Sequence, residues 1–197
     1  MSTDNEVIGR SIGSPGEFAA LYDRHARTIH RYAARRIGAE VADDILSETF
    51  LVAFDKRRAF DVSATSALPW LLGIANTLLK QHARREAIAW KGMVAAIAAD
   101  VVPDAIELAG ARMDAARSAK RLEGALRRLS AGDRDTVLLY AWGDLDYQGV
   151  ADALAIPLGT VRSRLNRARR LLRSALDIAT DKETFHGRTD TAPQRSY

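Results

Sequence analysis

Apolar residues recur three and four positions apart along most of this chain of 197 residues, and no convincing period-two alternation appears. That spacing gives a helix one apolar face, whereas a half-buried strand needs an apolar residue at every second position. The pattern therefore predicts an all-α fold. Helices are expected over residues 15–38, 40–56 and 67–86, and helical spacing returns between Leu122 and Leu172.

The pattern loosens between Trp90 and Ala116, and Pro103 within this stretch should break any helix. We interpret the stretch as a linker between two small helical domains. The expected organisation is a disordered N-terminus (1–14), a first domain of three or four helices (15–88), a linker (89–117), a second helical domain (118–177) and a disordered polar tail (178–197).

The chain contains no cysteine, which excludes disulfides, thiol nucleophiles and cysteine-based zinc sites. No segment approaches the roughly 18 to 20 apolar residues of a membrane span, and the N-terminus lacks a signal-peptide pattern. The sequence therefore predicts a soluble cytoplasmic protein with no membrane insertion. It carries no catalytic motif, and its four histidines lack ligand spacing, so we expect no enzymatic activity, no cofactor and no metal.

The most informative stretch, residues 146–173, is typical of a helix-turn-helix. Asp146 suits the N-cap of a short helix over residues 147–154, and Pro157 stands where a second helix would begin. Between Gly159 and Arg173 there are six arginines and no acid. Two helices joined by a short turn, the second one basic, indicate a DNA-binding module.

On the second helix of this motif, Val161, Leu165, Ala168 and Leu172 share one face and should point to the core. The opposite face would enter the major groove, where arginine can read guanine and asparagine can read adenine. The alternative is a solvated amphipathic helix whose arginines contact only water. The candidate DNA-binding residues are Gly159, Thr160, Arg162, Ser163, Asn166, Arg167 and Arg170.

This motif resembles region 4 of the extracytoplasmic-function (ECF) sigma factors, and three upstream blocks resemble region 2 of the same family. The blocks are FAALYDRHARTIHRYAARRIG, ADDILSETFLVAFDK and LPWLLGIANTLLKQHARRE. The resemblance implies an RNA polymerase sigma factor that directs the core enzyme to promoters and assists melting of the −10 element. It also implies contacts with the beta-prime clamp and the beta flap of the polymerase, binding of promoter DNA, and control by an anti-sigma factor.

The second expected helix carries five acids and no base between Glu40 and Asp55, whereas a merely solvated helix usually mixes both signs. An acidic face of this kind favours a basic partner, which the resemblance identifies as the beta-prime clamp helices. Phe50 in this helix is expected to belong to the core. The candidate polymerase-binding residues are Asp43, Asp44, Ser47 and Glu48.

The third helix becomes basic after its apolar start, and Lys80 and Arg84 are spaced to share one face. In the family this helix reads and opens the −10 element, while the preceding loop, residues 58–67, captures an unstacked base. Trp70 could stack on such a base, but core packing is the expected role. The candidate −10-binding residues are Asn76, Thr77, Lys80, Gln81, Arg84 and Arg85.

Three positions depart from the family pattern: Thr77 replaces a common asparagine, Gly149 replaces a capping glutamate, and Ala155 replaces a turn glycine. A left-handed conformation at Ala155 would cost more than at glycine. The competing interpretation of the whole chain is a free-standing helix-turn-helix regulator, which would bind duplex DNA alone, as a dimer. The upstream blocks are not expected in such a regulator.

Overall fold

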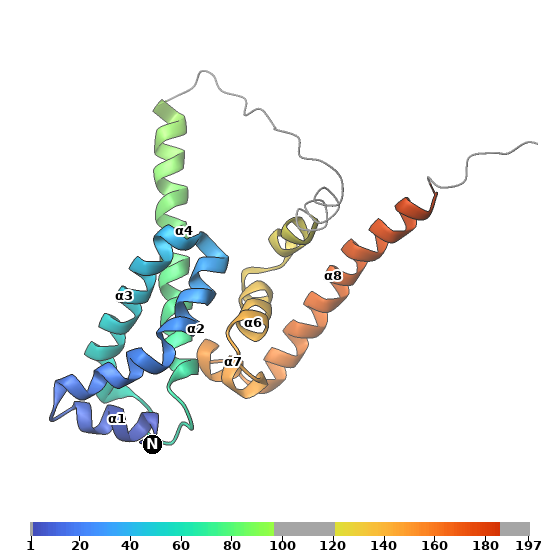
Figure 1. Ribbon diagram of the computed structural model, residues 1–197. Helices are drawn as coiled ribbons and strands as arrows, with labels where there is room; N and C mark the ends of the chain where they lie inside the picture. Colours follow the sequence, from blue (N-terminus) through green and yellow to red (C-terminus); the bar gives the residue numbers. More distant parts are fainter. Residues whose placement is uncertain (1, 97–120, 186–197) are drawn as a thin grey trace, which may run out of the picture.

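The computed structural model describes residues 2–96 and 121–185, and within these ranges the regular structure is entirely helical (Figure 1). The all-α prediction is confirmed. The first half is a bundle of α2 (Ala19–Ile37), α3 (Ala39–Lys56) and α4 (Leu68–Ala96), with short 3-10 turns η1 (Pro15–Phe18) and η2 (Arg57–Ala59). Gly38 joins α2 to α3 at φ 88°, a conformation that glycine adopts without a steric penalty.

The N-terminus differs from the expectation of disorder, because residues 4–11 form helix α1 (Asp4–Ser11). The Thr3 hydroxyl accepts a hydrogen bond from the Glu6 backbone N–H, and the Glu6 carboxylate accepts one from the Thr3 N–H, which is a capping box. Val7 and Ile8 are fully buried. The sequence T-x-x-E followed by two apolar residues is a recognisable start signal for this helix.

The second half contains a helical segment over 121–128, then α6 (Ala131–Trp142), α7 (Tyr147–Leu154) and α8 (Leu158–Phe185). Asp146 caps α7 by accepting from the Gly149 N–H at 2.7 Å, as the sequence predicted. Ala155 closes α7 in the left-handed region at φ 52° and ψ 48°, so the turn keeps the glycine-type conformation without a glycine.

The expected linker and tail are only partly described. Helix α4 continues to Ala96, beyond the predicted end at residue 86, and the rest of the expected linker lies outside the described residues. Helix α8 continues to Phe185, into the segment expected to be a disordered tail, and residues 186–197 lie outside the described residues as well.

The two halves pack against each other through α7 and α4 and share one continuous apolar core (Figure 1). Leu71, Leu72 and Leu79 of α4 belong to the same buried cluster as Val150 and Leu165 of the helix-turn-helix. A glycine in α4, at position 73, makes the close approach possible, because a Cβ atom there would lie 2.5 Å from the carbonyl oxygen of Ala153. The chain therefore adopts a closed arrangement, with the second half seated on the first.

Candidate nucleic-acid and polymerase interfaces

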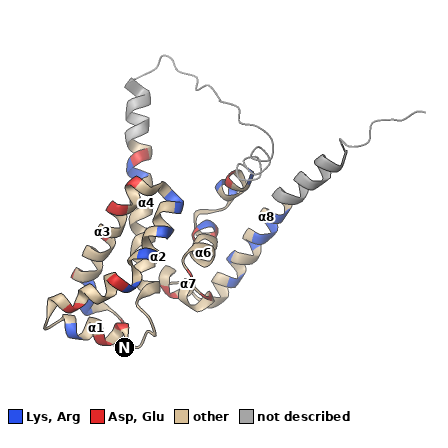
Figure 2. Ribbon diagram, viewed as in Figure 1, with Lys and Arg blue, Asp and Glu red and all other residues tan. Residues whose placement is uncertain are grey.

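Basic residues recur along α8 (Figure 2), and Arg162, Arg167, Arg169, Arg170 and Arg173 are exposed. Val161, Leu165 and Ala168 are buried and Leu172 is half-buried, so the predicted core face is confirmed. The predicted DNA-binding side chains lie on the other face, and most of them are exposed. The exposed members are Gly159, Arg162, Ser163, Asn166, Arg167 and Arg170, while Thr160 is half-buried.

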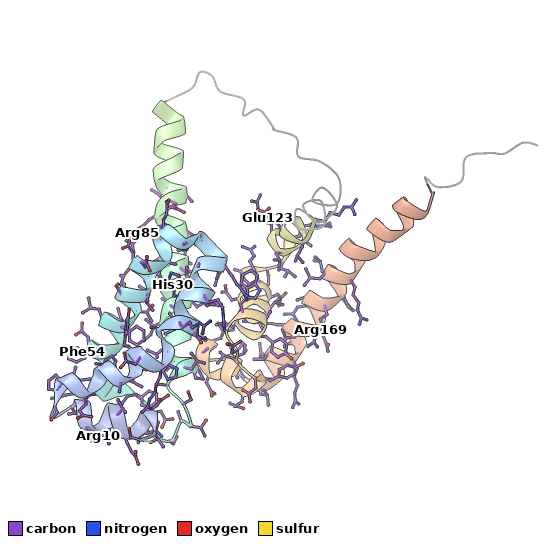
Figure 3. The ribbon with its side chains drawn as sticks, in the orientation of Figure 1. Arg10, His30, Phe54, Arg85, Glu123 and Arg169 are labelled. Carbon is purple, nitrogen blue, oxygen red and sulfur yellow. The ribbon has the colours of Figure 1, made fainter. Side chains whose placement is uncertain are left out.

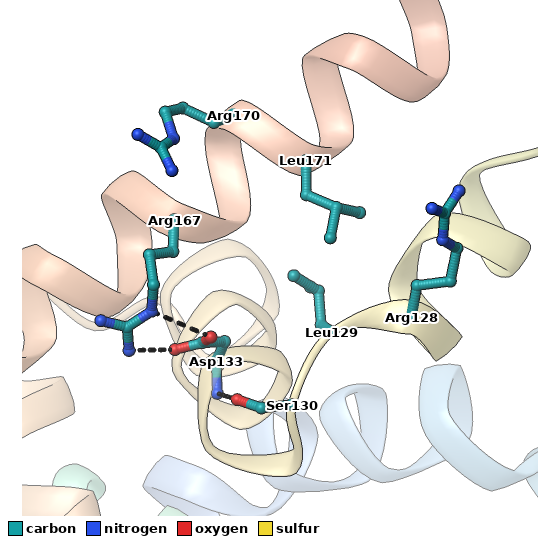
Figure 4. A pocket seen from close by; sticks show the side chains of 7 residues that line it. All are labelled: Arg128, Leu129, Ser130, Asp133, Arg167, Arg170 and Leu171. Atoms are coloured by element: carbon teal, nitrogen blue, oxygen red, sulfur yellow. Dashed lines mark hydrogen bonds and ion pairs between the residues drawn. The ribbon is translucent and has the colours of Figure 1, made fainter.

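Arg167 is exposed but engaged, because its guanidinium binds the Asp133 carboxylate through two bonds of 2.7 and 3.3 Å (Figure 4). Asp133 lies in the first turn of α6, beside the N-cap Ser130. The bond from Arg167 lowers the pKa of Asp133 below its ordinary 3.8, against the opposing effect of burial. The ion pair fixes the Arg167 side chain across the pocket that Figure 4 shows between α6 and α8.

Arg169 (labelled in Figure 3) donates a hydrogen bond of 2.9 Å to the Tyr147 hydroxyl and so joins α8 to α7. Tyr147 in turn packs edge-on against Tyr140 of α6, with ring centroids 5.3 Å apart. These contacts connect α6, α7 and α8 to one another.

Acidic residues recur along α3, where Figure 2 marks them in red. The predicted polymerase-binding residues Asp43, Asp44, Ser47 and Glu48 are all exposed, and Asp43 lies 3.3 Å from the His30 Nε2. Phe50 is only 8 % exposed and packs against Phe18 and Tyr22, which confirms that it belongs to the core.

Helix α4 is different, because part of its predicted −10 surface is covered. Asn76 is 2 % exposed and its side-chain oxygen accepts from Tyr32 and from Arg36. Asn76 is therefore enclosed in this conformation, and hydrogen bonds inside the bundle occupy its amide oxygen. Thr77, Gln81, Arg84 and Arg85 remain exposed, and Thr77 donates to the Gly73 carbonyl.

Lys80, the central residue of the predicted −10 surface, faces an acid from the other half. Its Nζ lies 2.5 Å from Asp135 Oδ2, and the Arg36 guanidinium lies 3.1 Å from Asp135 Oδ1. Asp135 belongs to α6 and is 2 % exposed. Burial raises the pKa of the neighbouring Tyr32 to about 12, so its hydroxyl stays protonated and donates to Asn76.

The connection between α3 and α4, which contains the candidate base-capturing loop, packs against the bundle through Phe60. Phe60 is buried and its ring lies 5.1 Å from that of Trp70, which is half-buried and packs against the core as predicted. A pocket at this site is lined by loop residues and, from α7, by Gln148 and Asp152.

No group of three or more potential metal ligands occurs within residues 2–96 and 121–185. In the same part of the chain, no helix combines the length and apolarity that a membrane crossing requires.

Comparison with known proteins identifies both halves. Residues 21–88 match sigma-70 region 2 and residues 119–172 match sigma-70 region 4. The chain belongs to the ECF sigma factors of the sigma-70 family. The chain is similar to the ECF RNA polymerase sigma factor SigL of Mycobacterium tuberculosis, with 29% identity over 86% of this chain and 94% of that protein. It is also similar to SigK of Mycobacterium bovis, with 27% identity over 91% and 97% of the two chains.

Two solved structures share the fold of this sigma factor. CnrH in complex with the cytosolic domain of CnrY has a TM-score of 0.63 at 22% identity and covers 90% of this chain and 99% of its own. RpoE from Bartonella quintana in complex with the anti-sigma factor NepR has a TM-score of 0.58 at 19% identity, covering 82% and 98%.

As a sigma factor, the chain directs core RNA polymerase to specific promoters and assists melting of the −10 element, and it is not itself an enzyme. It binds core polymerase and promoter DNA. Nothing found supports the alternative of a free-standing helix-turn-helix regulator, and the match to sigma-70 region 2 accounts for the upstream half instead.

The residues that sequence reasoning missed in this sigma factor are those that join its two halves. Asp135, Arg36 and Tyr32 form a buried polar network with Asn76 and Lys80. The signal for Asp135 was weak, because an acid at an otherwise ordinary helical position reveals no partner. A stronger signal marks the acid at position 133, since it stands three residues after a serine at the start of a helix.

Proposed function

We propose that the exposed face of α8 recognises the −35 element, with Arg162, Ser163 and Asn166 at the start of the helix reaching base edges. The observation that carries this assignment is the separation of faces on α8: its apolar stripe is buried, while its guanidinium and amide groups face solvent. Arg167 and Arg170 lie further along the helix, where contact with phosphates is the expected role. Gly159 and Thr160 bring the backbone of the helix start close to the DNA.

On region 2 we propose that Lys80, Gln81, Arg84, Arg85 and Thr77 contact the −10 element, with loop 58–67 receiving the unstacked base. Asn76 is given a supporting role, because it is buried and bonded to Tyr32 and Arg36. The half-buried Trp70 beside Phe60 supplies a wall of the adjoining pocket.

The acidic face of α3 is proposed to bind the beta-prime clamp through Asp43, Asp44, Ser47 and Glu48, because all four are exposed and the three charged ones are acids, which suits a basic partner. Region 4 is proposed to contact the beta flap. The protein acts in the cytoplasm with the polymerase. An anti-sigma factor is a further proposed partner, supported by the fold shared with sigma factors that were solved in complex with CnrY and NepR.

The test is reconstituted transcription with core polymerase and a promoter selected from a randomised library by the wild-type holoenzyme. Asp44→Lys should lower affinity for core about tenfold, because it places a cation against the proposed basic partner, while leaving the promoter preference of the assembled holoenzyme unchanged. Arg162→Ala should leave core affinity unchanged and weaken −35-dependent initiation. Failure of the wild-type chain to give promoter-specific initiation, or identical behaviour of the two variants, would contradict the assignment.

A further inference from the structure

Helix α1 lies against the connection between α3 and α4 and bonds to it at both ends. At the start of α1 the Asn5 amide donates to the carbonyl oxygens of Val62 and Ala64, both at 2.7 Å. At the other end the Ser11 carbonyl accepts from Arg57 Nε at 3.4 Å. An element of eight residues thus spans the whole segment from η2 to the start of α4.

Asp4 adds a second attachment, at the end of the loop. Its carboxylate accepts from the Ala67 N–H at 2.9 Å and from the Ser66 hydroxyl at 3.3 Å. It is also paired with Arg24 and His25 of α2, each at 2.8 Å. Burial alone would raise the pKa of Asp4, but the bonds from Ala67, Arg24 and His25 outweigh burial and lower it, so the carboxylate remains charged at neutral pH.

Helix α1 is itself anchored and can therefore support a loop. Its capping box fixes the first turn, and Val7 and Ile8 are fully buried in the core of the region 2 bundle. The Ser11 hydroxyl is buried and bonded to the Ile8 carbonyl. The loop thus bonds to a helix that is held by packing on its other side.

We propose that Asp4 and Asn5 are positioning residues for loop 58–67 and that they hold it in the shape that discriminates the −10 sequence. The inference rests on the proposed role of this loop in receiving an unstacked base. A loop that is already ordered loses less conformational entropy when a base enters it. Two bonds donated to the Val62 and Ala64 carbonyls and one accepted from the Ala67 N–H hold its backbone on both sides of Thr65, and a further bond comes from the Ser66 hydroxyl.

The decisive variant is Asn5→Asp, which keeps the shape of the side chain but replaces the amide donor with a carboxylate facing two carbonyls. With reconstituted holoenzyme, initiation is measured on the selected promoter and on versions with single-base changes in the −10 element. The ratio between these promoters should fall about 3- to 10-fold, as expected for the loss of one or two hydrogen bonds. Affinity for core polymerase should stay within about twofold of the wild-type value.

Arg10→Ala is the matched control, because Arg10 lies on the same helix and its side chain bonds only to the exposed Glu17 among its described contacts. It should leave the ratio unchanged, whereas Asn5→Gln, which keeps the amide donor, should recover part of it. A discrimination ratio that is unchanged in Asn5→Asp would overturn the proposal. An equal loss on every promoter, with a lowered melting temperature, would also overturn it, because that result assigns α1 to stability alone.

The proposal and the function it rests on can fail separately. If the wild-type chain gives no promoter-specific initiation, the assignment of the −10 loop fails and the positioning role fails with it. If the wild-type chain discriminates −10 sequences and Asn5→Asp does so equally well, only the positioning role fails.

A second inference comes from the contact between the halves. The Asp135 carboxylate lies between Lys80 and Arg36, 2.5 and 3.1 Å from their nitrogens, on the surface where the −10 element is proposed to bind. An oxyanion held between two cations has the same chemistry as a backbone phosphate in a protein–DNA complex. The close approach of α7 to α4 at Gly73 keeps α6, which carries Asp135, in place.

We infer that region 4 is an intramolecular competitor of promoter DNA for the α4 surface, with Asp135 in the position of a phosphate. The Lys80 side chain is partly exposed, and its charge is released from Asp135 when α6 and α7 move away from α4. The competition is intramolecular, so binding of the polymerase to either half could shift it by stabilising the separated arrangement.

Gly73→Ala tests this inference, because the added methyl group would meet the Ala153 backbone at 2.5 Å and that backbone cannot yield without moving α7. Alanine also favours a helix over glycine, so α4 by itself should not be weakened. Gly124→Ala is the matched control, since a Cβ atom there meets nothing within 4 Å.

The chain has no cysteine, so Glu40→Cys and Ser174→Cys introduce the only two labelling sites for energy transfer between the halves. Gly73→Ala should lengthen the distance between the labels and tighten binding of the free protein to a single-stranded −10 oligonucleotide about 5- to 100-fold. A long distance already in the wild-type chain, or no difference between the two glycine variants, would overturn the inference. A longer distance without tighter DNA binding would overturn the proposed competition. Reconstituted transcription tests the sigma activity separately.

Discussion

The two basic helices of this sigma factor carry the same kind of charge but differ in how available it is. On α8 the arginines at 162 and 170 face solvent, and the buried stripe lies on the opposite side. On α4 the central cation, Lys80, is paired with Asp135, and Asn76 is enclosed. Apart from Arg167, which pairs with Asp133 of the same half, the −35 surface is therefore presented in the closed arrangement, whereas the −10 surface is partly neutralised by the other half of the same chain.

The difference shows that a basic helix in a sequence reports charge but not accessibility. The two helices look alike in the sequence, since each has an apolar stripe and a set of cations. Accessibility depends on contacts between residues that lie far apart in the chain, such as Lys80 with Asp135. Substitutions on each surface, and at the turn and ion pair that hold region 4 together, test whether the two surfaces differ as the structure indicates.

The largest effect is expected from Arg162→Ala. Loss of a specific arginine contact with DNA typically costs about 1–3 kcal/mol, so −35-dependent initiation should fall about 5- to 100-fold. Lys80→Ala is the comparison on the other surface: in the free protein, where Asp135 already occupies Lys80, DNA binding should change less than about twofold. The measurements are abortive initiation for the first variant and fluorescence anisotropy of the free chain for the second. A large loss of free-chain DNA binding in Lys80→Ala would remove the contrast.

Asp135→Asn should make Lys80 of the −10 surface available to DNA, as the arginines of the −35 surface already are. Without the carboxylate charge, Lys80 can bind a phosphate, and single-stranded DNA binding by the free chain should tighten about 3- to 10-fold, because the pair is half open to solvent on the lysine side. The slope of log K against log salt should steepen by up to about one unit. Adding Lys80→Ala to this variant should abolish the gain, and a gain that persists in the double variant would show that Lys80 is not the freed cation.

Ala155→Gly tests the turn between α7 and α8. Ala155 adopts φ 52°, a region that alanine occupies at a cost and glycine does not. The variant should raise the free energy of unfolding by about 1 kcal/mol, less any entropy that glycine adds to the unfolded chain. Thermal denaturation followed by circular dichroism measures this against the wild-type chain. A lowered stability would indicate that the left-handed turn is not strained.

The smallest effect concerns Asp133, whose pKa is held below 3.8 chiefly by Arg167. A carboxylate with a lowered pKa in the folded state stabilises that state above its ordinary pKa, and this stabilisation is lost as pH falls through the lowered value. Asp133→Asn should therefore reduce the loss of unfolding free energy between pH 6 and about pH 3. The reduction should be below about 1 kcal/mol, as is typical of a partly exposed pair, and it is measured as a smaller drop in melting temperature. An unchanged acid dependence in this variant would show that the pair contributes nothing measurable.

The sequence predicted the helices of the bundle and of the helix-turn-helix well, because their apolar spacing is regular and their ends carry chemical signals. Gly38 closes α2, and Asp146 caps α7, as expected. The burial of Phe50 and the exposure of Arg162 followed from the same periodicity. These features depend on interactions within a few turns of one helix, which a single sequence encodes directly.

Other features need information that local patterns carry weakly or not at all. The T-x-x-E capping box at Thr3 does predict a helix, so the expectation of a disordered N-terminus gave this short signal too little weight. The burial of Asn76 and the pairing of Asp135 could not be predicted, since both arise from packing between segments that lie far apart in the chain. The DNA contacts themselves stay predictions, because they depend on the position of a partner.

The close approach at Gly73 has a genetic consequence. Any glycine codon becomes an alanine codon through a single base substitution, and that change adds the one carbon atom for which the α4–α7 contact has no space. If the contact competes with promoter DNA as proposed, a point mutation in the gene could separate α7 from α4 permanently and leave the −10 surface uncovered in the free protein. Selection for mutants that express the regulon without the inducing signal would then be expected to recover substitutions at this codon.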